Sequence, residues 1–93
     1  TAKVAVAAAL PGDAEAQTQA GLALAKEGRA LEALPALRRA HALDPQAAER
    51  KRDLARTLGE AADAELSRGS AAAARSLLSE AAALEPRFPE LLE

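Results

Sequence analysis

The sequence predicts an all-α domain in which antiparallel helical hairpins stack into a short solenoid, with one long helix near residues 46–67. Two observations carry this prediction. Pro11 and Pro45 each follow a stretch rich in Ala and Leu. Residues 81–86 repeat the pattern of residues 40–45, because both place alanines before a Leu, an acidic residue and a proline. A pattern that recurs every 20 to 50 residues, roughly, is typical of stacked helix-turn-helix units, each of which buries its apolar face against a neighbour.

The second interval between prolines is longer than the first. The interval from Pro45 to Pro86 exceeds the interval from Pro11 to Pro45 by seven positions. Seven residues form about two turns of α-helix, so they can lengthen a helix while its buried face stays nearly in phase. We therefore expect one extended helix.

Alanine supplies most of the apolar residues. The chain has 93 residues, of which 49% are hydrophobic; 28 are Ala and 15 are Leu, and Cys is absent. Alanine is the strongest helix former but contributes little apolar area. We expect a thin core and closely packed helices, which suit a solenoid better than a roomy pocket. Without cysteine, disulfides and thiolate metal sites are excluded.

The charges are balanced and interspersed. Twelve basic and 14 acidic residues leave a net charge of −2, which gives no overall field to attract nucleic acid or an anionic membrane. No apolar run has the length of a membrane span. We therefore expect no nucleic-acid partner and a cytoplasmic location, with the periplasm as the alternative. The alanine-rich composition and the missing initial Met suggest a piece of a larger bacterial protein.

The first helices are bounded by prolines and glycines. Residues 2–10 are expected to be helical and to end at Pro11 and Gly12. A second helix, about 14–27, begins after Asp13, a good N-cap residue, and ends at Gly28, which readily adopts the left-handed conformation found after helices. A third helix spans about 29–43. Its apolar stripe has three- and four-residue spacing and consists of Leu31, Leu34, Leu37, Ala40 and Leu43.

Proline also marks the middle of the chain. Pro35 lacks the N–H that would bond the Leu31 carbonyl, so we expect a kink or a late helix start there. Pro45 opens the long helix, about 46–67. Its apolar face consists of Leu54, Leu58, Ala61, Ala62 and Leu66.

A second glycine turn follows the long helix. Gly69 ends that helix and Ser70 caps the next one, roughly 71–84. Residues 85–89 end this helix, and residues 89–92 are expected to begin another. Because the connections are short, neighbouring helices should be antiparallel.

Small residues recur at matching places in the two hairpins. The first hairpin has Gly21, Ala33, Leu37, Ala40 and Pro45; the second has Ala62, Ala74, Leu78, Ala81 and Pro86. This order resembles the tetratricopeptide repeat, whose pattern is Trp-x2-Leu-Gly-x2-Tyr, then Ala-x3-Phe, then Pro. Gly21, Ala33 and Pro45 are identical to it. Every aromatic position is filled by another residue, and Glu65 stands at the Tyr position.

The resemblance implies one TPR-like domain over residues 1–93. It would consist of a partial unit 1–13, a unit 14–45, an extended unit 46–86, and a tail or the start of a next unit at 87–93. It also implies that a partner docks on the concave surface formed by the first helix of each unit. That surface would contain Glu15, Thr18, Leu22 and Lys26 from one helix and Arg52, Arg56, Gly59 and Asp63 from the other. Neither set reproduces the Lys/Asn clamp with which some relatives hold a peptide carboxylate.

The residues offer no catalytic constellation. His41 is the only histidine, and a catalytic or metal role needs partners that converge on it. The serines lack a neighbouring base, and no phosphate-binding loop or metal-spaced carboxylates occur. We therefore expect neither enzyme activity nor a cofactor.

One charged segment has two interpretations. Residues 49–56 hold four cations near the start of a helix, where the macrodipole disfavours them, and acidic residues three or four positions away offset part of this. The segment is either a solvated helix face or a small basic patch that meets an acidic partner.

These observations predict a non-catalytic protein–protein interaction module that binds a protein or peptide, acidic if the basic segment takes part. The alternative is a structural module that acts by self-association, because fewer than three complete units leave apolar ends uncovered. A homo-oligomer would cover the apolar residues at the two ends: Val4, Val6, Leu10, Phe88, Leu91 and Leu92.

Overall fold

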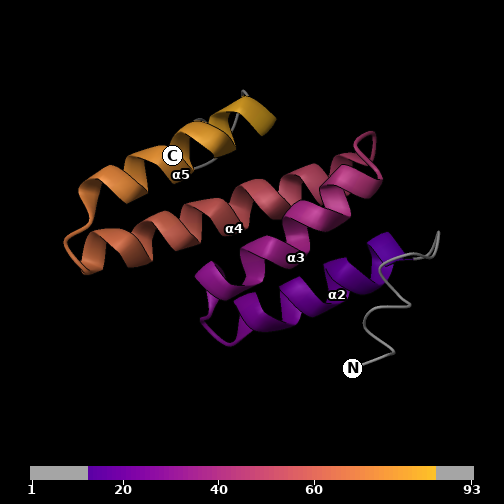
Figure 1. Cartoon of the computed structure of the whole chain (residues 1–93), viewed down its shortest axis with the longest axis horizontal. Helices are drawn as coiled ribbons and strands as arrows, with labels where there is room; N and C mark the ends of the chain where they lie inside the picture. Colours follow the sequence, from indigo (N-terminus) through magenta and orange to yellow (C-terminus); the bar gives the residue numbers. More distant parts are fainter. Residues whose placement is uncertain (1–12, 86–93) are drawn as a thin grey trace.

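A computed structural model describes residues 13–85 of the chain, which form four α-helices (Figure 1). The helices are α2 (Asp13–Lys26), α3 (Ala30–Leu43), α4 (Ala48–Ser67) and α5 (Ala71–Leu84). The helix expected at 2–10 and the one expected to begin at 89–92 lie outside the described residues. Within residues 13–85, no helix is both long enough and apolar enough to span a membrane.

The helices pack as sequential antiparallel pairs. α2 pairs with α3 and α4 pairs with α5, while α3 also packs against α4 (Figure 1). The predicted all-α class and antiparallel hairpins are therefore confirmed. α4 has 20 residues where each of the other helices has 14, and it runs unbroken through residues 52–55, so the expected long helix is present.

Both pairs turn through the same backbone motif. Gly28 and Gly69 have φ of 80° and 83°, the left-handed conformation that glycine adopts without steric cost. The N–H of Arg29 donates to the Leu24 carbonyl, and the N–H of Ser70 donates to the Glu65 carbonyl. Each is the six-to-one hydrogen bond of a Schellman motif, which satisfies a carbonyl at the helix end. The predicted glycine C-termini are thus confirmed.

Two predicted helix starts are wrong in detail. Ser70 holds the N-cap position of α5, but its side chain makes no capping hydrogen bond. α4 begins at Ala48 instead of residue 46, because Pro45 and Gln46 lie in a turn that the Ala47 N–H closes by donating to the Asp44 carbonyl over 3.2 Å.

Helix α3 passes through Pro35 without interruption. It begins at Ala30, five residues earlier, so the alternative of a late start is wrong and the expected kink stays a prediction. Pro35 is exposed, whereas Leu34 and Ala36 beside it are buried. Burial of this face stabilises α3 despite the missing hydrogen bond to Leu31.

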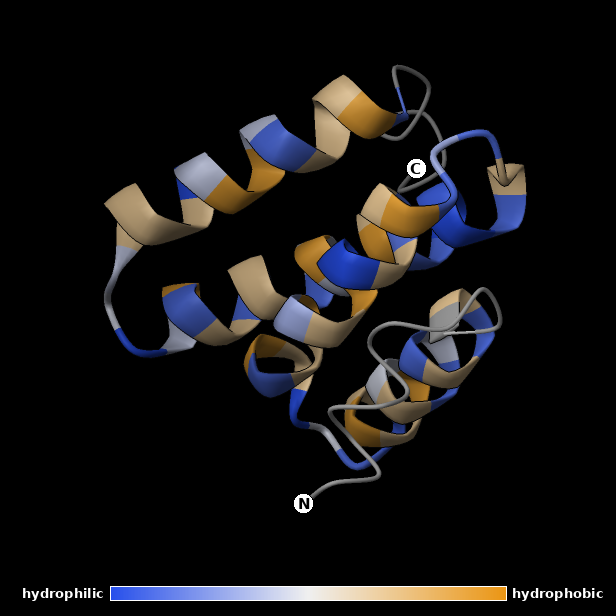
Figure 2. Ribbon diagram, turned by 45° about the vertical axis from the view of Figure 1, so that its right-hand side comes forward, coloured by the Kyte–Doolittle hydropathy of each residue, from blue (hydrophilic) through white to orange (hydrophobic). Residues whose placement is uncertain are grey.

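The core is built from a few leucines and many alanines. Leu34, Leu37, Leu54 and Leu58 are buried there together with alanines of α3, α4 and α5. Apolar and hydrophilic segments alternate along the helices, as expected of helices with one buried face (Figure 2). Leu43 and Leu66, which the apolar stripes placed inside, are about half exposed. Both lie in the last turn of a helix, where less neighbouring helix covers them.

Helices α2 and α3 approach each other closely at Gly21. A Cβ atom at this position would lie 2.6 Å from Cγ of Leu37 and 3.3 Å from the carbonyl oxygen of Ala33. Only a residue without a side chain fits, so Gly21 lets α2 contact α3 closely. This contact brings α2 close against α3.

Candidate functional site

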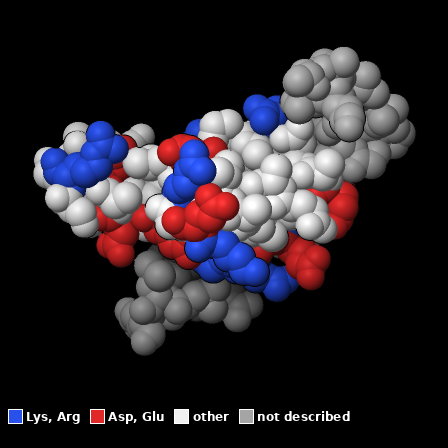
Figure 3. All heavy atoms as spheres, turned by 90° about the horizontal axis from the view of Figure 1, so that it is seen from below, with Lys and Arg blue, Asp and Glu red and all other residues white. Residues whose placement is uncertain are grey.

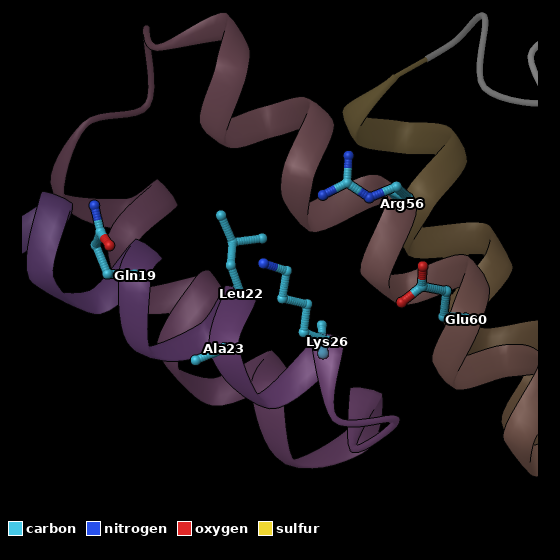
Figure 4. A pocket seen from close by; sticks show the side chains of 7 residues that line it. Gln19, Leu22, Ala23, Lys26, Arg56 and Glu60 are labelled. Atoms are coloured by element: carbon cyan, nitrogen blue, oxygen red, sulfur yellow. The ribbon is translucent and has the colours of Figure 1, made fainter.

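A surface depression lies between α2 and α4. α3 packs against both of these helices, whereas α2 and α4 contact each other only sparsely. A hollow of about 490 Å³ opens between them, and Figure 4 shows side chains entering it from both helices. Its lining consists of Gln19, Leu22, Ala23, Ala25 and Lys26 from α2 and Arg56 and Glu60 from α4.

A second hollow, of about 320 Å³, adjoins the first. It is lined by Glu15, Thr18, Gln19 and Leu22 from α2 and Glu49, Arg50 and Asp53 from α4. Because Gln19 and Leu22 line both hollows, the two form one depression along α2, which we call the α2–α4 groove. Leu22 lies at its middle and supplies apolar surface there.

The structure brings most of the predicted surface residues together. From α2, Glu15, Thr18, Leu22 and Lys26 all line the groove, and so does Arg56 from α4. Arg52, Gly59 and Asp63 line neither hollow, and the side chains of Arg52 and Asp63 are exposed elsewhere on α4.

The groove face of α4 is a different stripe from the one predicted. It consists of Glu49, Asp53, Arg56 and Glu60, which share one helix face because they are spaced by four, three and four residues. The predicted stripe through Arg52 and Arg56 has the same spacing. Spacing alone therefore could not separate the two stripes. The first stripe is mostly acidic, with Arg56 as its one cation, and no local pattern in the sequence marks it as the face that lines the groove.

Arg50 links three parts of the chain at one end of the groove. Its side chain is only 19% exposed, and its guanidinium contacts Oε1 of Glu15 at 3.2 Å and Oδ2 of Asp44 at 3.1 Å. Its Nε donates to Oγ1 of Thr18 over 3.1 Å, and that hydroxyl donates to the Ala14 carbonyl over 2.7 Å. Arg50 thus joins α2, the α3–α4 turn and α4 through charge-assisted hydrogen bonds.

These pairings reduce the positive charge of residues 49–56. Besides Arg50, Arg56 is paired with Asp53, its guanidinium lying 3.2 Å from Oδ1. Two of the four cations in the segment are therefore already paired with acidic side chains of the same chain. On the face shown in Figure 3, basic and acidic side chains are intermixed. The segment offers isolated charges more than a continuous basic patch.

The groups with catalytic potential do not converge in the part of the chain that is described. His41 is partly buried, and its Nδ1 finds no hydrogen-bond partner among residues 13–85. The same residues contain no group of three or more His, Cys, Asp or Glu that could hold a metal ion. The absence of enzyme activity stays a prediction.

Comparison of the chain with protein-family models, with curated proteins and with solved structures found no match. The chain is therefore assigned to no family. The geometry of the α2–α4 groove is the basis for a proposal about function.

Proposed function

We propose that this chain is a non-catalytic protein–protein interaction module of the tetratricopeptide type, which holds an extended segment of a partner protein in the α2–α4 groove. One observation carries the proposal. The first helices of both pairs, α2 and α4, line a single groove that has an apolar middle at Leu22 and charged side chains at either end. Apolar surface with a few placed polar groups is typical of sites that bind a ligand specifically.

The packing at the resemblance positions supports the repeat type. Gly21 in the first pair lies against Leu37 and Ala33. The repeat pattern has a small residue at the positions of Gly21 and Ala33 and a large residue at the position of Leu37. In the second pair, Ala62, Ala74 and Ala81 are buried. Small residues at these places let the helices of a pair approach closely.

A blocking substitution tests the proposal. Ala23 is exposed and lines the larger hollow, so Ala23→Trp fills the groove without removing a core contact. Peptides selected from a random display library by the unmodified chain should bind the Ala23→Trp variant at least tenfold more weakly. Ala72→Trp is the matched control, since Ala72 is exposed on α5 and lines neither hollow. Peptides that bind both variants equally would contradict the proposal.

A second role, assembly by self-association, is favoured by one exposed side chain. Leu78 lies in the middle of α5 and is 38% exposed, although it occupies the position equivalent to the buried Leu37. Sedimentation at increasing concentration should then show dimers that Leu78→Lys removes. A monomer at all concentrations would contradict this second role and leave groove binding unaffected.

A further inference from the structure

The two hollows of the α2–α4 groove carry opposite net charges. The larger hollow has the cations Lys26 and Arg56 and one acidic residue, Glu60. The smaller hollow has one cation, Arg50, and three acidic residues: Glu15, Glu49 and Asp53. The groove therefore changes sign along its length, with Leu22 between the two ends.

The charges that are left unpaired sharpen this polarity. Arg50 is held by Glu15 and Asp44, and Arg56 is held by Asp53. Within residues 13–85, neither Lys26 nor Glu49 forms an ion pair. Figure 4 shows that Lys26 extends its ammonium group into the larger hollow. Each end of the groove thus presents at least one charge that is available to a ligand.

We propose, on the basis of the function proposed above, that the groove selects a peptide whose charges are segregated. Acidic residues of the peptide lie against Lys26, an apolar residue lies over Leu22, and basic residues lie against Glu49, because Lys26 and Glu49 form no ion pair within residues 13–85. Opposite charges placed at the two ends fix the direction in which the peptide lies, because the reversed arrangement places like charges together.

The dimensions suit a short segment. Glu15 and Lys26 are eleven residues apart on one helix, which corresponds to roughly 16 Å at about 1.5 Å per residue. An extended peptide advances about 3.3 Å per residue, so about five residues span the groove. A peptide with an acidic half, a central leucine and a basic half therefore matches both the charges and the length.

These charges also have a simpler effect on the helices themselves. Glu15 and Glu49 lie in the first turns of α2 and α4, and Lys26 lies in the last turn of α2, where each complements the helix macrodipole. Helix stabilisation requires only that the charges be present. Ligand selection requires, in addition, that the order of charges in the ligand affect binding. An experiment that varies only this order therefore distinguishes the two effects.

The test compares two synthetic peptides of identical composition. One has an acidic half, a central leucine and a basic half; the other alternates acidic and basic residues around the leucine. At low ionic strength the segregated peptide should bind roughly 3- to 10-fold more tightly, as expected for two or three exposed ion pairs. The difference should shrink as salt rises, because salt screens exposed charges.

The direction of binding is tested by a charge swap. With a nitroxide label on the acidic end of the segregated peptide, the amide signal of residue 26 should broaden more than that of residue 49. Lys26→Glu combined with Glu49→Lys keeps the net charge of −2 and should reverse this order. Lys26→Gln combined with Glu49→Gln should weaken the preference for the segregated peptide, and circular dichroism verifies the helix content of each variant. Arg75→Glu, an exposed change on α5, is the control that should change nothing.

The outcomes separate this inference from the function on which it rests. Equal binding of both peptides, blocked by Ala23→Trp, would overturn charge selection while peptide binding in the groove stands. If the charge swap does not reverse the order of broadening at residues 26 and 49, charge selection is overturned as well. If neither peptide binds, or if binding is insensitive to Ala23→Trp, both the inference and the proposed function are contradicted.

Discussion

The two helix pairs share one turn but differ in how their second helices are buried. Gly28 and Gly69 hold equivalent places after α2 and α4, and they adopt the same conformation with the same hydrogen bonds. Leu37 of α3 and Leu78 of α5 follow these glycines at the same separation along the chain, yet Leu37 is 2% exposed and Leu78 is 38% exposed. Local sequence sets the turn, because the turn needs only its own backbone. Whether the leucine after the turn is buried depends instead on the helices that pack around it.

The neighbours explain the difference. α3 lies between α2 and α4, so both of its sides are covered. Within residues 13–85, α5 packs mainly on α4, and its contact with the first pair includes the bidentate hydrogen bonds from Arg38 to Glu80, at 2.8 and 2.9 Å. The pairing with Glu80 raises the pKa of Arg38 above its ordinary value, so Arg38 stays charged. Within residues 13–85, the second helix of the first pair is thus covered on both sides, whereas α5 presents a partly exposed face that includes Leu78.

The largest expected difference between the pairs comes from truncating the equivalent leucines. Leu37→Ala should lower the free energy of unfolding by about 3 kcal/mol, because it removes a fully buried side chain and leaves a cavity. Leu78→Ala should cost about 1 kcal/mol or less, since much of the side chain is already in water. Urea unfolding measures both values. Equal losses would show that α5 is covered as fully as α3.

Gly21 gives the next largest effect. Gly21→Ala places a Cβ atom 2.6 Å from Cγ of the buried Leu37, so we expect a loss of about 1–2 kcal/mol despite the better helix propensity of alanine. In combination with Leu37→Ala the clash is removed, so the loss caused by Gly21→Ala should disappear. Strictly additive losses in this double-mutant cycle would contradict the close approach. Ala62→Gly, at the matching position of α4, should cost about 1 kcal/mol through helix propensity and lost contact.

The two turns should respond alike. Gly28→Ala and Gly69→Ala each force a left-handed conformation on a residue with a side chain, which costs about 1–2 kcal/mol. A Cβ atom at either position meets no atom within 4 Å, so backbone strain is the only cost. Thermal unfolding of the two variants should therefore give closely similar losses. A much larger loss in one pair would mean that the turns differ in more than position.

The smallest effect belongs to the Arg38–Glu80 link between the pairs. Both side chains are more than a third exposed, so Arg38→Met or Glu80→Gln should cost about 0.5–1 kcal/mol at most. Raising the salt concentration should weaken the link in the unmodified chain and leave the variants less affected. A loss well above this range would show that α5 depends on this link for its placement.

The sequence predicts helices and turns well because these depend on neighbouring residues. Glycine at positions 28 and 69 permits the left-handed conformation that ends each helix, and the stripe through Leu34 and Leu37 identifies the buried side of α3. The prediction of burial fails at the ends of the stripes. Whether Leu43 or Leu66 is covered depends on where the next helix stops.

The groove could be predicted on one side only. Helix α2 has the same length as α3 and α5, and the surface residues that the resemblance implied on it, among them Leu22 and Lys26, line the groove. Helix α4 is extended, and two stripes with equal spacing pass through Arg56. The stripe that faces α2 is decided by side-chain contacts such as Arg50 with Glu15, which no local pattern contains.

The groove on α2 and α4 and the open face of α5 are the two competing surfaces for a partner, and one titration separates them. A peptide selected by the unmodified chain is added to the isotope-labelled chain while amide chemical shifts are recorded. Binding in the groove predicts the largest shifts at Leu22, Lys26 and Arg56, with residues around Leu78 unchanged. Shifts concentrated around Leu78, with the groove residues unchanged, would contradict the proposed function.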